Sequence, residues 1–194
     1  HVISEADLER YEHTDIHQIL SVVPGVYLRG EDGFGLRPNI GMRGVSSDRS
    51  KKVVIMEDGV LIAPAPYAAP AGYYFPLTTR LGAVEIYKGP TMLPYGPNTL
   101  GGAINLVTAT MPYGPVAEFD LELGQDTFGR LHARVGDGGD NWSYFVDMAH
   151  LETDGFKVVD GGGKSGYLRN DILFKGRWDS DPAGSTLHRV DIKV

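Results

Sequence analysis

The side chains of this sequence best suited to ligand chemistry lie between Arg37 and Lys52. One acidic residue, Asp48, stands there against five cationic ones, which are Arg37, Arg43, Arg49, Lys51 and Lys52. Five positive charges against one negative charge give a local charge of +4, in a chain whose formal net charge is −7. A guanidinium group binds a carboxylate through two parallel hydrogen bonds, and a concentrated positive field attracts anions. The cluster therefore predicts a site for an anionic ligand, with a solvated charged loop as the alternative.

A second candidate is the segment 63–76, which is rich in proline and aromatic residues. Prolines at positions 64, 66, 70 and 76 exclude a regular helix or strand. Rigid aromatic side chains supply contact area at little entropic cost. We therefore expect a ligand-facing surface here, and the alternative is a stiff loop with its aromatics packed beneath it. The aromatic residues are Tyr67, Tyr73, Tyr74 and Phe75.

The other polar residues do not predict catalysis. No G-x-S-x-G element is present, and Gly102 stands where a phosphate-binding loop needs lysine. His13 and His17 are four residues apart, but no third metal ligand is obvious, so we interpret them as surface residues. The chain has no cysteine, which excludes disulfides and thiolate metal sites. We expect no enzymatic activity, no metal and no cofactor, and the acidic composition disfavours nucleic acid as a partner.

The first sixty residues are expected to form short helices and strands that position the cationic cluster. Ser4 and Asp7 have the spacing of a capping box. A second helix is expected from about Thr14–Asp15, with apolar residues on one face, and Pro24–Gly25 should end it. Further along the chain we expect strands at Val26–Leu28 and Val53–Met56. A hairpin turn at Asp58–Gly59 should then lead into Val60–Ile62.

The stretch Glu85–Thr108 is the most constrained part of the sequence. An apolar strand at Val84–Tyr87 should break at Gly89–Pro90. A compact turn is expected at Tyr95–Asn98, before a second strand at Ala103–Thr108. Glycine tolerates positive φ, so this stretch can fold back tightly.

After Pro112 the pattern changes to long alternating strands. The strand 116–124 has apolar residues on one face and acidic residues on the other, and 129–136 sets apolar against basic residues. Neighbouring acidic and basic faces favour cross-strand pairing. Strands of about 9–11 residues with one apolar face are typical of a transmembrane barrel, although a soluble antiparallel sheet has the same pattern. Further strands are expected at Trp142–Glu152, Tyr167–Trp178 and Thr186–Val194, with a long loop at Thr153–Gly166.

Four ordered blocks in the first 110 residues resemble the plug-domain signature of TonB-dependent outer-membrane receptors. The blocks are PGV (24–26), IGMRG (40–44), VVIMEDGV (53–60) and EIYKGPTMLPYGPNTLGGAINLVT (85–108). The proline-tyrosine loop is most similar to the ferric citrate receptor branch, although Ala68–Ala69 replaces a polar residue of that loop. The resemblance implies an α+β plug domain at 1–112, a small mixed sheet with short helices, followed at 113–194 by antiparallel strands of an incomplete transmembrane β-barrel.

The resemblance also implies a function. The protein would import a ferric chelate, ferric citrate-like or another anionic siderophore, across the bacterial outer membrane with energy delivered through TonB. Arg37, Arg43, Arg49, Tyr67, Tyr73 and Tyr74 would contact the substrate, and Arg43 and Lys88 would anchor the plug in the barrel lumen. The alternatives are a receptor for a non-iron nutrient and an outer-membrane signalling or structural module without transport.

About five strands cannot close a barrel, because the smallest outer-membrane barrels have about eight. An open strand edge in hydrocarbon leaves backbone groups unpaired. We therefore expect this chain to be part of a longer protein. The resemblance implies that its TonB-binding segment lies upstream of His1.

Overall fold

The computed structural model describes most of the chain in two compact units, His1–Ala109 (unit 1) and Thr110–Val194 (unit 2). Each unit is described by itself. The described residues are 1–11, 15–31, 33–62, 75–89, 99–180 and 188–194. The expected break at Pro90 and the expected turn at Tyr95–Asn98 lie outside the described residues.

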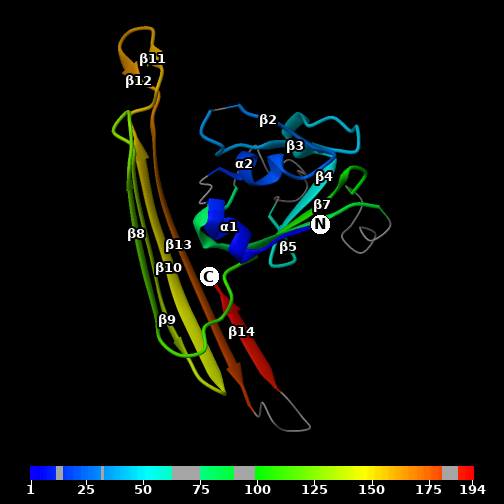
Figure 1. Cartoon of the computed structure of the whole chain (residues 1–194), viewed down its shortest axis with the longest axis vertical. Coiled ribbons are helices and arrows are strands. Elements are labelled where there is room, and N and C mark those ends of the chain that lie inside the picture. Colours follow the sequence, from blue (N-terminus) through cyan, green and yellow to red (C-terminus); the bar gives the residue numbers. More distant parts are fainter. Residues whose placement is uncertain (12–14, 32, 63–74, 90–98, 181–187) are drawn as a thin grey trace. The chain divides into compact units, whose positions relative to one another are not determined.

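Unit 1 contains short helices and two small sheets (Figure 1). Its helical elements are α1 (Glu5–Tyr11), α2 (Ile16–Ser21) and the 3-10 turns η1 (Asp48–Ser50) and η3 (Thr78–Arg80). Its strands are β1 (Val2–Ile3), β2 (Val26–Arg29), β3 (Asn39–Met42), β4 (Val53–Glu57), β5 (Val60–Leu61), β6 (Leu81–Tyr87) and β7 (Gly102–Thr108).

Both predicted helix starts are confirmed. The Ser4 N–H donates to Asp7 Oδ2 at 3.1 Å and the Asp7 N–H donates to Ser4 Oγ at 3.3 Å, which is the reciprocal pattern of a capping box. Asp15 caps α2, because its carboxylate accepts the N–H of His17 at 2.7 Å. These caps satisfy backbone donors that the helix itself leaves unpaired.

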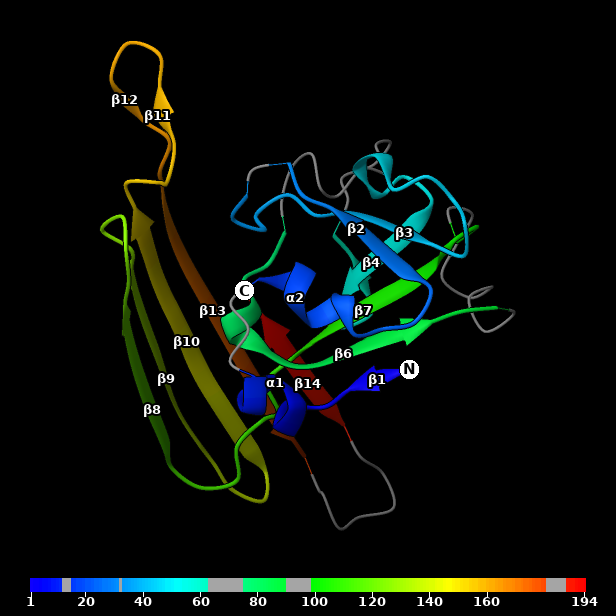
Figure 2. The same ribbon diagram turned by 45° about the horizontal axis from the view of Figure 1, so that its top comes forward.

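The larger sheet of unit 1 is mixed, with the strand order β1-β6-β7-β4-β5. Strands β6 and β7 pair antiparallel, whereas β4 runs parallel to β7 (Figure 2). Strands β2 and β3 form a separate antiparallel pair. The predicted α+β fold with a small mixed sheet and short helices is therefore confirmed.

The core of unit 1 lies between α2 and the strands. Ile16, Ile19 and Leu20 of α2 are at most 3% exposed, and they pack with buried side chains of β3, β4, β6 and β7. A buried leucine or isoleucine contributes about 1.5–3 kcal/mol relative to an exposed one. Burial of these side chains therefore fixes the helices against the sheet.

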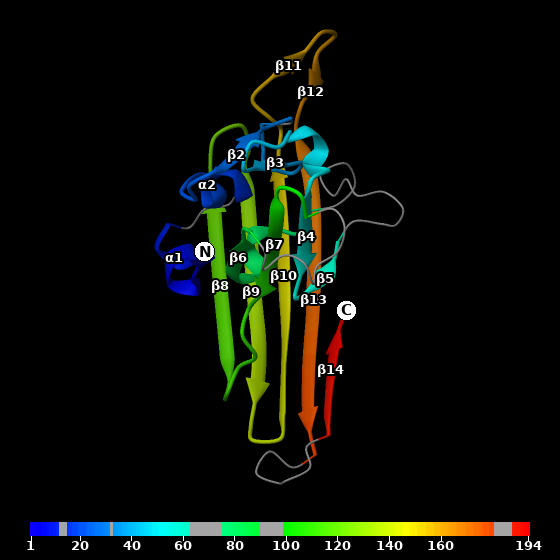
Figure 3. The same ribbon diagram turned by 90° about the vertical axis from the view of Figure 1, so that its right-hand side faces the viewer.

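Unit 2 is an open antiparallel sheet with the strand order β14-β13-β10-β9-β8 (Figure 3). Its long strands are β8 (Val116–Leu123), β9 (Gly129–Gly138), β10 (Trp142–Thr153), β13 (Tyr167–Asp179) and β14 (Arg189–Lys193). The predicted long loop at Thr153–Gly166 is partly wrong. It contains a short hairpin, in which β11 (Val158–Val159) pairs with β12 (Gly163–Lys164).

The two faces of this sheet differ in chemistry. One face carries exposed apolar side chains, among them Phe119, Leu121, Ile172, Trp178 and Ile192. The other carries acidic and basic side chains opposite one another, because successive residues of a strand point to opposite faces. The strands β8 and β9 therefore have the alternation that the sequence predicted for 116–124 and 129–136.

Among the described residues, no helix is both long and apolar enough to cross a membrane.

Candidate functional site

Arg43 lies in a tight turn directly after β3. Its φ is 55° and that of Gly44 is 83°. The Val45 N–H donates to the Met42 carbonyl oxygen at 3.2 Å, which closes a turn of the type I′ geometry. The Arg43 N–H also donates to the Gly25 carbonyl oxygen at 3.2 Å. Two backbone hydrogen bonds thus fix the turn that carries the exposed Arg43 side chain.

Tyr27 supports this turn from the neighbouring strand β2. Its hydroxyl donates to the Val45 carbonyl oxygen. The Tyr27 ring lies so close to Gly41 that a Cβ at that position would overlap it. The backbone path of residues 40–44 therefore requires glycine at position 41 and a tight turn at Arg43–Gly44.

Arg49 is brought to the start of β3. Its N–H donates to Asn39 Oδ1 at 2.7 Å. The next residue, Ser50, accepts the Ile40 N–H at 2.9 Å and donates to the Pro38 carbonyl oxygen at 3.0 Å. These bonds hold η1 against the strand. Arg37 precedes Asn39 by two residues, so Arg37 and Arg49 flank the same end of β3 and Arg43 follows the other end.

Arg29 joins this surface, which sequence reasoning missed. It pairs with Asn39 in the register of β2 and β3. Only that long-range pairing places it beside Arg49, so no local pattern could have identified it. We call the exposed side chains of Arg29, Arg37, Arg43, Arg49 and Lys52 the cationic surface.

The cationic surface has little internal neutralisation. Lys51 Nζ lies 2.7 Å from Asp48 Oδ2. That hydrogen bond, with the nearby positive charges of Lys51, Arg49 and Arg29, holds the pKa of Asp48 below its usual value. Within the part of the chain that the structure describes, no carboxylate pairs with the five side chains of the cationic surface. They are available to an anion from solution.

The two predicted plug-anchoring residues meet at one segment of unit 1. Lys88 Nζ donates to the carbonyl oxygen of Pro24, and the Arg43 N–H donates to that of Gly25. Lys88 is thereby directed toward the turn that carries Arg43. Its predicted role in anchoring the plug in the barrel lumen stays a prediction.

The aromatic segment is described only at its end. Tyr67, Tyr73 and Tyr74 lie outside the described residues. Phe75 is 3% exposed and packs in the core of unit 1. The expectation that the ligand-facing surface extends to Phe75 is therefore wrong, because the ring is buried among aliphatic side chains.

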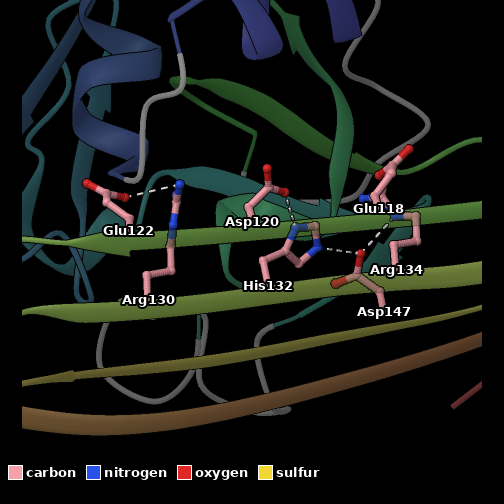
Figure 4. A network of polar contacts seen from close by, with 7 residues as sticks. All are labelled: Glu118, Asp120, Glu122, Arg130, His132, Arg134 and Asp147. Carbon is pink, nitrogen blue, oxygen red and sulfur yellow. Dashed lines mark hydrogen bonds and ion pairs between the residues drawn. The ribbon is translucent and has the colours of Figure 1, made fainter.

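Unit 2 carries a polar network on its charged face (Figure 4). Asp147 Oδ2 lies 2.9 Å from both His132 Nε2 and Arg134 Nε, and His132 Nδ1 lies 3.2 Å from Asp120 Oδ2. Two further ion pairs flank it: Arg134 with Glu118 at 3.0 Å and Arg130 with Glu122 at 3.1 Å. The predicted pairing of an acidic strand with a basic one is confirmed.

This network neutralises its own charges, whereas the cationic surface does not. Each cation in Figure 4 faces a carboxylate of a neighbouring strand. Among the described residues, no group of three or more His, Cys, Asp or Glu side chains could hold a metal ion. The cationic surface of unit 1 is therefore the better candidate for binding an anionic ligand.

The family model described as TonB-dependent Receptor Plug Domain matches residues 1–103, which is more than half of the chain. The chain belongs to this family of TonB-dependent receptors.

Two curated relatives are vitamin B12 transporters. The chain is 26% identical over 171 residues to "Vitamin B12 transporter BtuB" of Photobacterium profundum, a match that covers 80% of this chain and 27% of the relative. It is 26% identical over 193 residues to the protein of the same name from Vibrio vulnificus, covering 98% of this chain and 29% of the relative. The chain therefore spans less than a third of the length of these relatives.

Two solved structures, of an uptake receptor and of a transporter, share the fold. The ferric yersiniabactin uptake receptor FyuA from Yersinia pestis matches 92% of this chain and 28% of its own, with a TM-score of 0.75 and 22% identity. The ferric citrate transporter FecA in its unliganded form matches 100% of this chain and 30% of its own, with a TM-score of 0.77 and 18% identity. The match to FecA extends through the strands of unit 2, so the plug and partial-barrel architecture is shared.

Proposed function

We propose that the chain forms the plug and the first barrel strands of an outer-membrane receptor that imports an anionic ferric chelate with energy from TonB. The observation that carries the proposal is the cationic surface, which is exposed in an acidic protein and has no carboxylate partners among the described residues. A chelate brings its own iron ligands, so the protein needs only to recognise its carboxylates or other anionic groups. Arg37, Arg43 and Arg49 would do so through bidentate hydrogen bonds.

The proposed division is a plug at 1–112 and barrel strands at 113–194. The unit boundary after Ala109 lies close to this division. Tyr67, Tyr73 and Tyr74 are proposed as further substrate contacts on sequence grounds alone.

Location in the outer membrane is supported by the apolar face of unit 2. Aromatic side chains gather at one end of that face, where Trp142 pairs with Trp178 and stacks on Tyr144 with ring centroids 5.9 Å apart. Aromatic residues concentrate at the interface between hydrocarbon and headgroups in transmembrane barrels. The 12 residues of β10 and the 13 of β13 exceed the length of about 9–11 residues that spans a bilayer.

Import of a non-iron nutrient is the second candidate. Both curated relatives reported above are named as vitamin B12 transporters. A corrinoid offers fewer anionic groups than ferric citrate, so it would use the cationic surface less. Which of these two substrates is imported therefore determines whether the cationic surface is used for substrate binding.

Uptake measurements test the proposal. A strain that lacks the full-length gene should lose uptake of one or more labelled anionic ferric chelates, and the restored gene should recover it only when TonB is present. Labelled vitamin B12 and a neutral ferric siderophore serve as comparison substrates. Loss of vitamin B12 uptake alone would replace the first candidate by the second. Unchanged uptake of every compound would contradict import.

A further inference from the structure

Two arginines of the cationic surface have an uncommon backbone conformation. Arg43 and Arg49 have φ values of 55° and 48°, and Ser50, which follows Arg49, has a φ of 53°. Residues other than glycine rarely take positive φ, because the Cβ atom crowds the backbone. Where they do, surrounding contacts hold them, and such residues concentrate at functional sites. The contacts that hold Arg43 and Arg49 are therefore candidates for a role in ligand binding.

We call residues 43–52 the cationic loop, and Gly101 contacts it near both ends. The Gly101 N–H donates to the Lys52 carbonyl oxygen at 2.8 Å, which fixes the last residue of the loop. Near the other end lies Val45, directly after the Arg43–Gly44 turn, and a Cβ atom on Gly101 would lie 2.6 Å from Val45 Cγ2. Gly101 is itself buried. A single buried residue therefore closes the cationic loop.

Space, and not backbone conformation, requires glycine at position 101. The φ of Gly101 does not lie in the left-handed region. An added Cβ atom would lie 2.6 Å from Val45 Cγ2, 3.0 Å from the Lys52 carbonyl oxygen and 3.2 Å from Val53 Cγ2. These distances are shorter than an ordinary carbon contact of about 3.5–4.0 Å, and a valine side chain has little rotational freedom with which to move away. Alanine at this position therefore has to push Val45 or Lys52 outward and open the loop.

Other residues of unit 1 support the start and the middle of the cationic loop. Asn39 Oδ1 accepts the Arg49 N–H, and the Tyr27 hydroxyl donates to the Val45 carbonyl oxygen. Both contacts involve backbone groups of the loop, so they leave the side chains of Arg43 and Arg49 exposed. The loop is therefore held at its start, middle and end by residues outside it.

We propose that Gly101 is a positioning residue for the anionic ligand: it holds the cationic loop closed, so that Arg43 and Arg49 are in their binding arrangement before the ligand arrives. The inference rests on the proposed function, because it concerns the same cationic surface. An open loop would have to be ordered during binding, and that ordering lowers affinity. A neutral chelate gains little from the two arginines, so its binding should not depend on closure of the loop.

Residue-resolved amide exchange in the full-length protein, measured in lipid without ligand, tests the closure. Gly101→Ala should accelerate exchange of the Val45 and Arg49 amides at least about tenfold, while the amides paired between β6 and β7 keep their protection. Gly139→Ala is the control, because a Cβ atom on Gly139 of unit 2 would meet nothing nearer than Trp142 Nε1 at 3.5 Å. Unchanged exchange of Val45 and Arg49 in Gly101→Ala would overturn the closure.

Binding calorimetry tests the positioning role, with ferric citrate and a neutral ferric siderophore as probes. Gly101→Ala should raise the Kd for ferric citrate at least about tenfold and change the Kd for the neutral siderophore by less than about twofold. In an Arg43→Ala background the same substitution should weaken ferric citrate much less, because the arginine that Gly101 positions is gone. Equal weakening of both probes would indicate a general loss of structure and overturn the positioning role, and so would unchanged ferric citrate binding.

Val45→Ala provides a second variant if Gly101→Ala does not fold. It removes the methyl groups that face Gly101 without adding atoms, and it should weaken ferric citrate binding while sparing the neutral siderophore. An unchanged Kd for ferric citrate in folded Val45→Ala would overturn the proposal. If the unaltered receptor binds no anionic chelate, the proposed function and the positioning role both fail, whereas amide exchange alone decides whether the loop is closed.

Discussion

Units 1 and 2 use their apolar side chains in opposite ways. In unit 1 most of the described large aliphatic residues are buried, and Leu106 and Ile104 are 0% exposed. In unit 2 most of the described residues of the same type lie on the surface, with Leu121 62% and Ile172 69% exposed, although Leu151 and Leu173 are buried. Both hydrophobic clusters found among the described residues belong to unit 1.

This difference indicates two sources of stability. Unit 1 removes its apolar surface from water by folding on itself, which is the dominant favourable term in water. In unit 2, neighbouring strands are joined by backbone hydrogen bonds and by ion pairs between their side chains. One face of the sheet remains apolar and exposed, so it requires a non-aqueous environment such as lipid to cover it. We therefore expect the stability of unit 1 to depend on substitutions in its core, and the stability of unit 2 to depend on substitutions on its surface.

The largest effect is expected from Leu106→Ala in the core of unit 1. Loss of the buried side chain and the remaining cavity should lower the free energy of unfolding by about 2–5 kcal/mol. Leu100→Ala is the control, because Leu100 is 67% exposed. Denaturant unfolding of the full-length protein measures both. Equal effects of the two substitutions would contradict a self-contained core in unit 1.

A slightly smaller effect is expected from Ile172→Arg on the apolar face of unit 2. A guanidinium near the middle of a bilayer should cost about 2–4 kcal/mol of folding free energy in lipid vesicles. Lys175→Arg keeps a cation on the opposite face of the same strand and should change little. If Ile172→Arg folds into vesicles as stably as Lys175→Arg does, this face is not in contact with hydrocarbon.

Asp58→Ala should weaken the end of unit 1 more moderately. Asp58 has a φ of 49° in the turn between β4 and β5, and it accepts two hydrogen bonds from Thr108. Alanine loses those bonds and tolerates this backbone poorly, so we expect a loss of about 1–3 kcal/mol. Asp58→Asn keeps one acceptor and adopts positive φ more readily, so its loss should be smaller. Thermal unfolding that ranks asparagine below alanine would contradict this explanation.

The smallest effects concern two exposed carboxyl groups, one in each unit. The hydrogen bonds from Ser4 hold the pKa of Asp7 below 3.8, and those from Lys164 and Thr127 hold the pKa of Asp154 below 3.8. A lowered pKa in the folded state adds stability above the unfolded value, and this stability is lost as the pH falls through the folded pKa. Acid should therefore weaken both contacts below about pH 4.

Carbon-13 NMR titration of the carboxyl groups checks this prediction. Ser4→Ala should raise the pKa of Asp7 toward 3.8 and leave that of Asp154 unchanged, and Lys164→Gln should do the reverse. A shift of both carboxyl groups by either substitution would show that the two contacts are not independent.

Local features of the fold could be predicted from the sequence because their causes are local. The capping pairs at Ser4 and Asp15 involve residues three or fewer positions apart. The turn at Asp58–Gly59 needs two residues that tolerate positive φ, and both have it. The alternation of the unit 2 strands follows from the two-residue period of a β-strand.

Long-range features could not be predicted in this way. The parallel pairing of β4 with β7 joins segments about 50 residues apart, and no local pattern encodes it. The burial of Phe75 depends on its packing in the core of unit 1, and the placement of Arg29 beside Asn39 depends on the pairing of β2 with β3. The cationic residues of 37–52 were predicted because they are close in the sequence, whereas Arg29 required the structure.

Binding calorimetry of the full-length receptor tests the central claim most directly. The protein is titrated with ferric citrate, a second anionic ferric chelate and a neutral one, and each titration is repeated with Arg43→Ala. As a control, Arg10→Ala removes an exposed arginine of α1 outside the cationic surface. We expect the anionic chelates to bind best, and Arg43→Ala to weaken them by more than about 1.5 kcal/mol while Arg10→Ala has no effect. Preference for the neutral chelate, together with unchanged binding in Arg43→Ala, would contradict the proposed site.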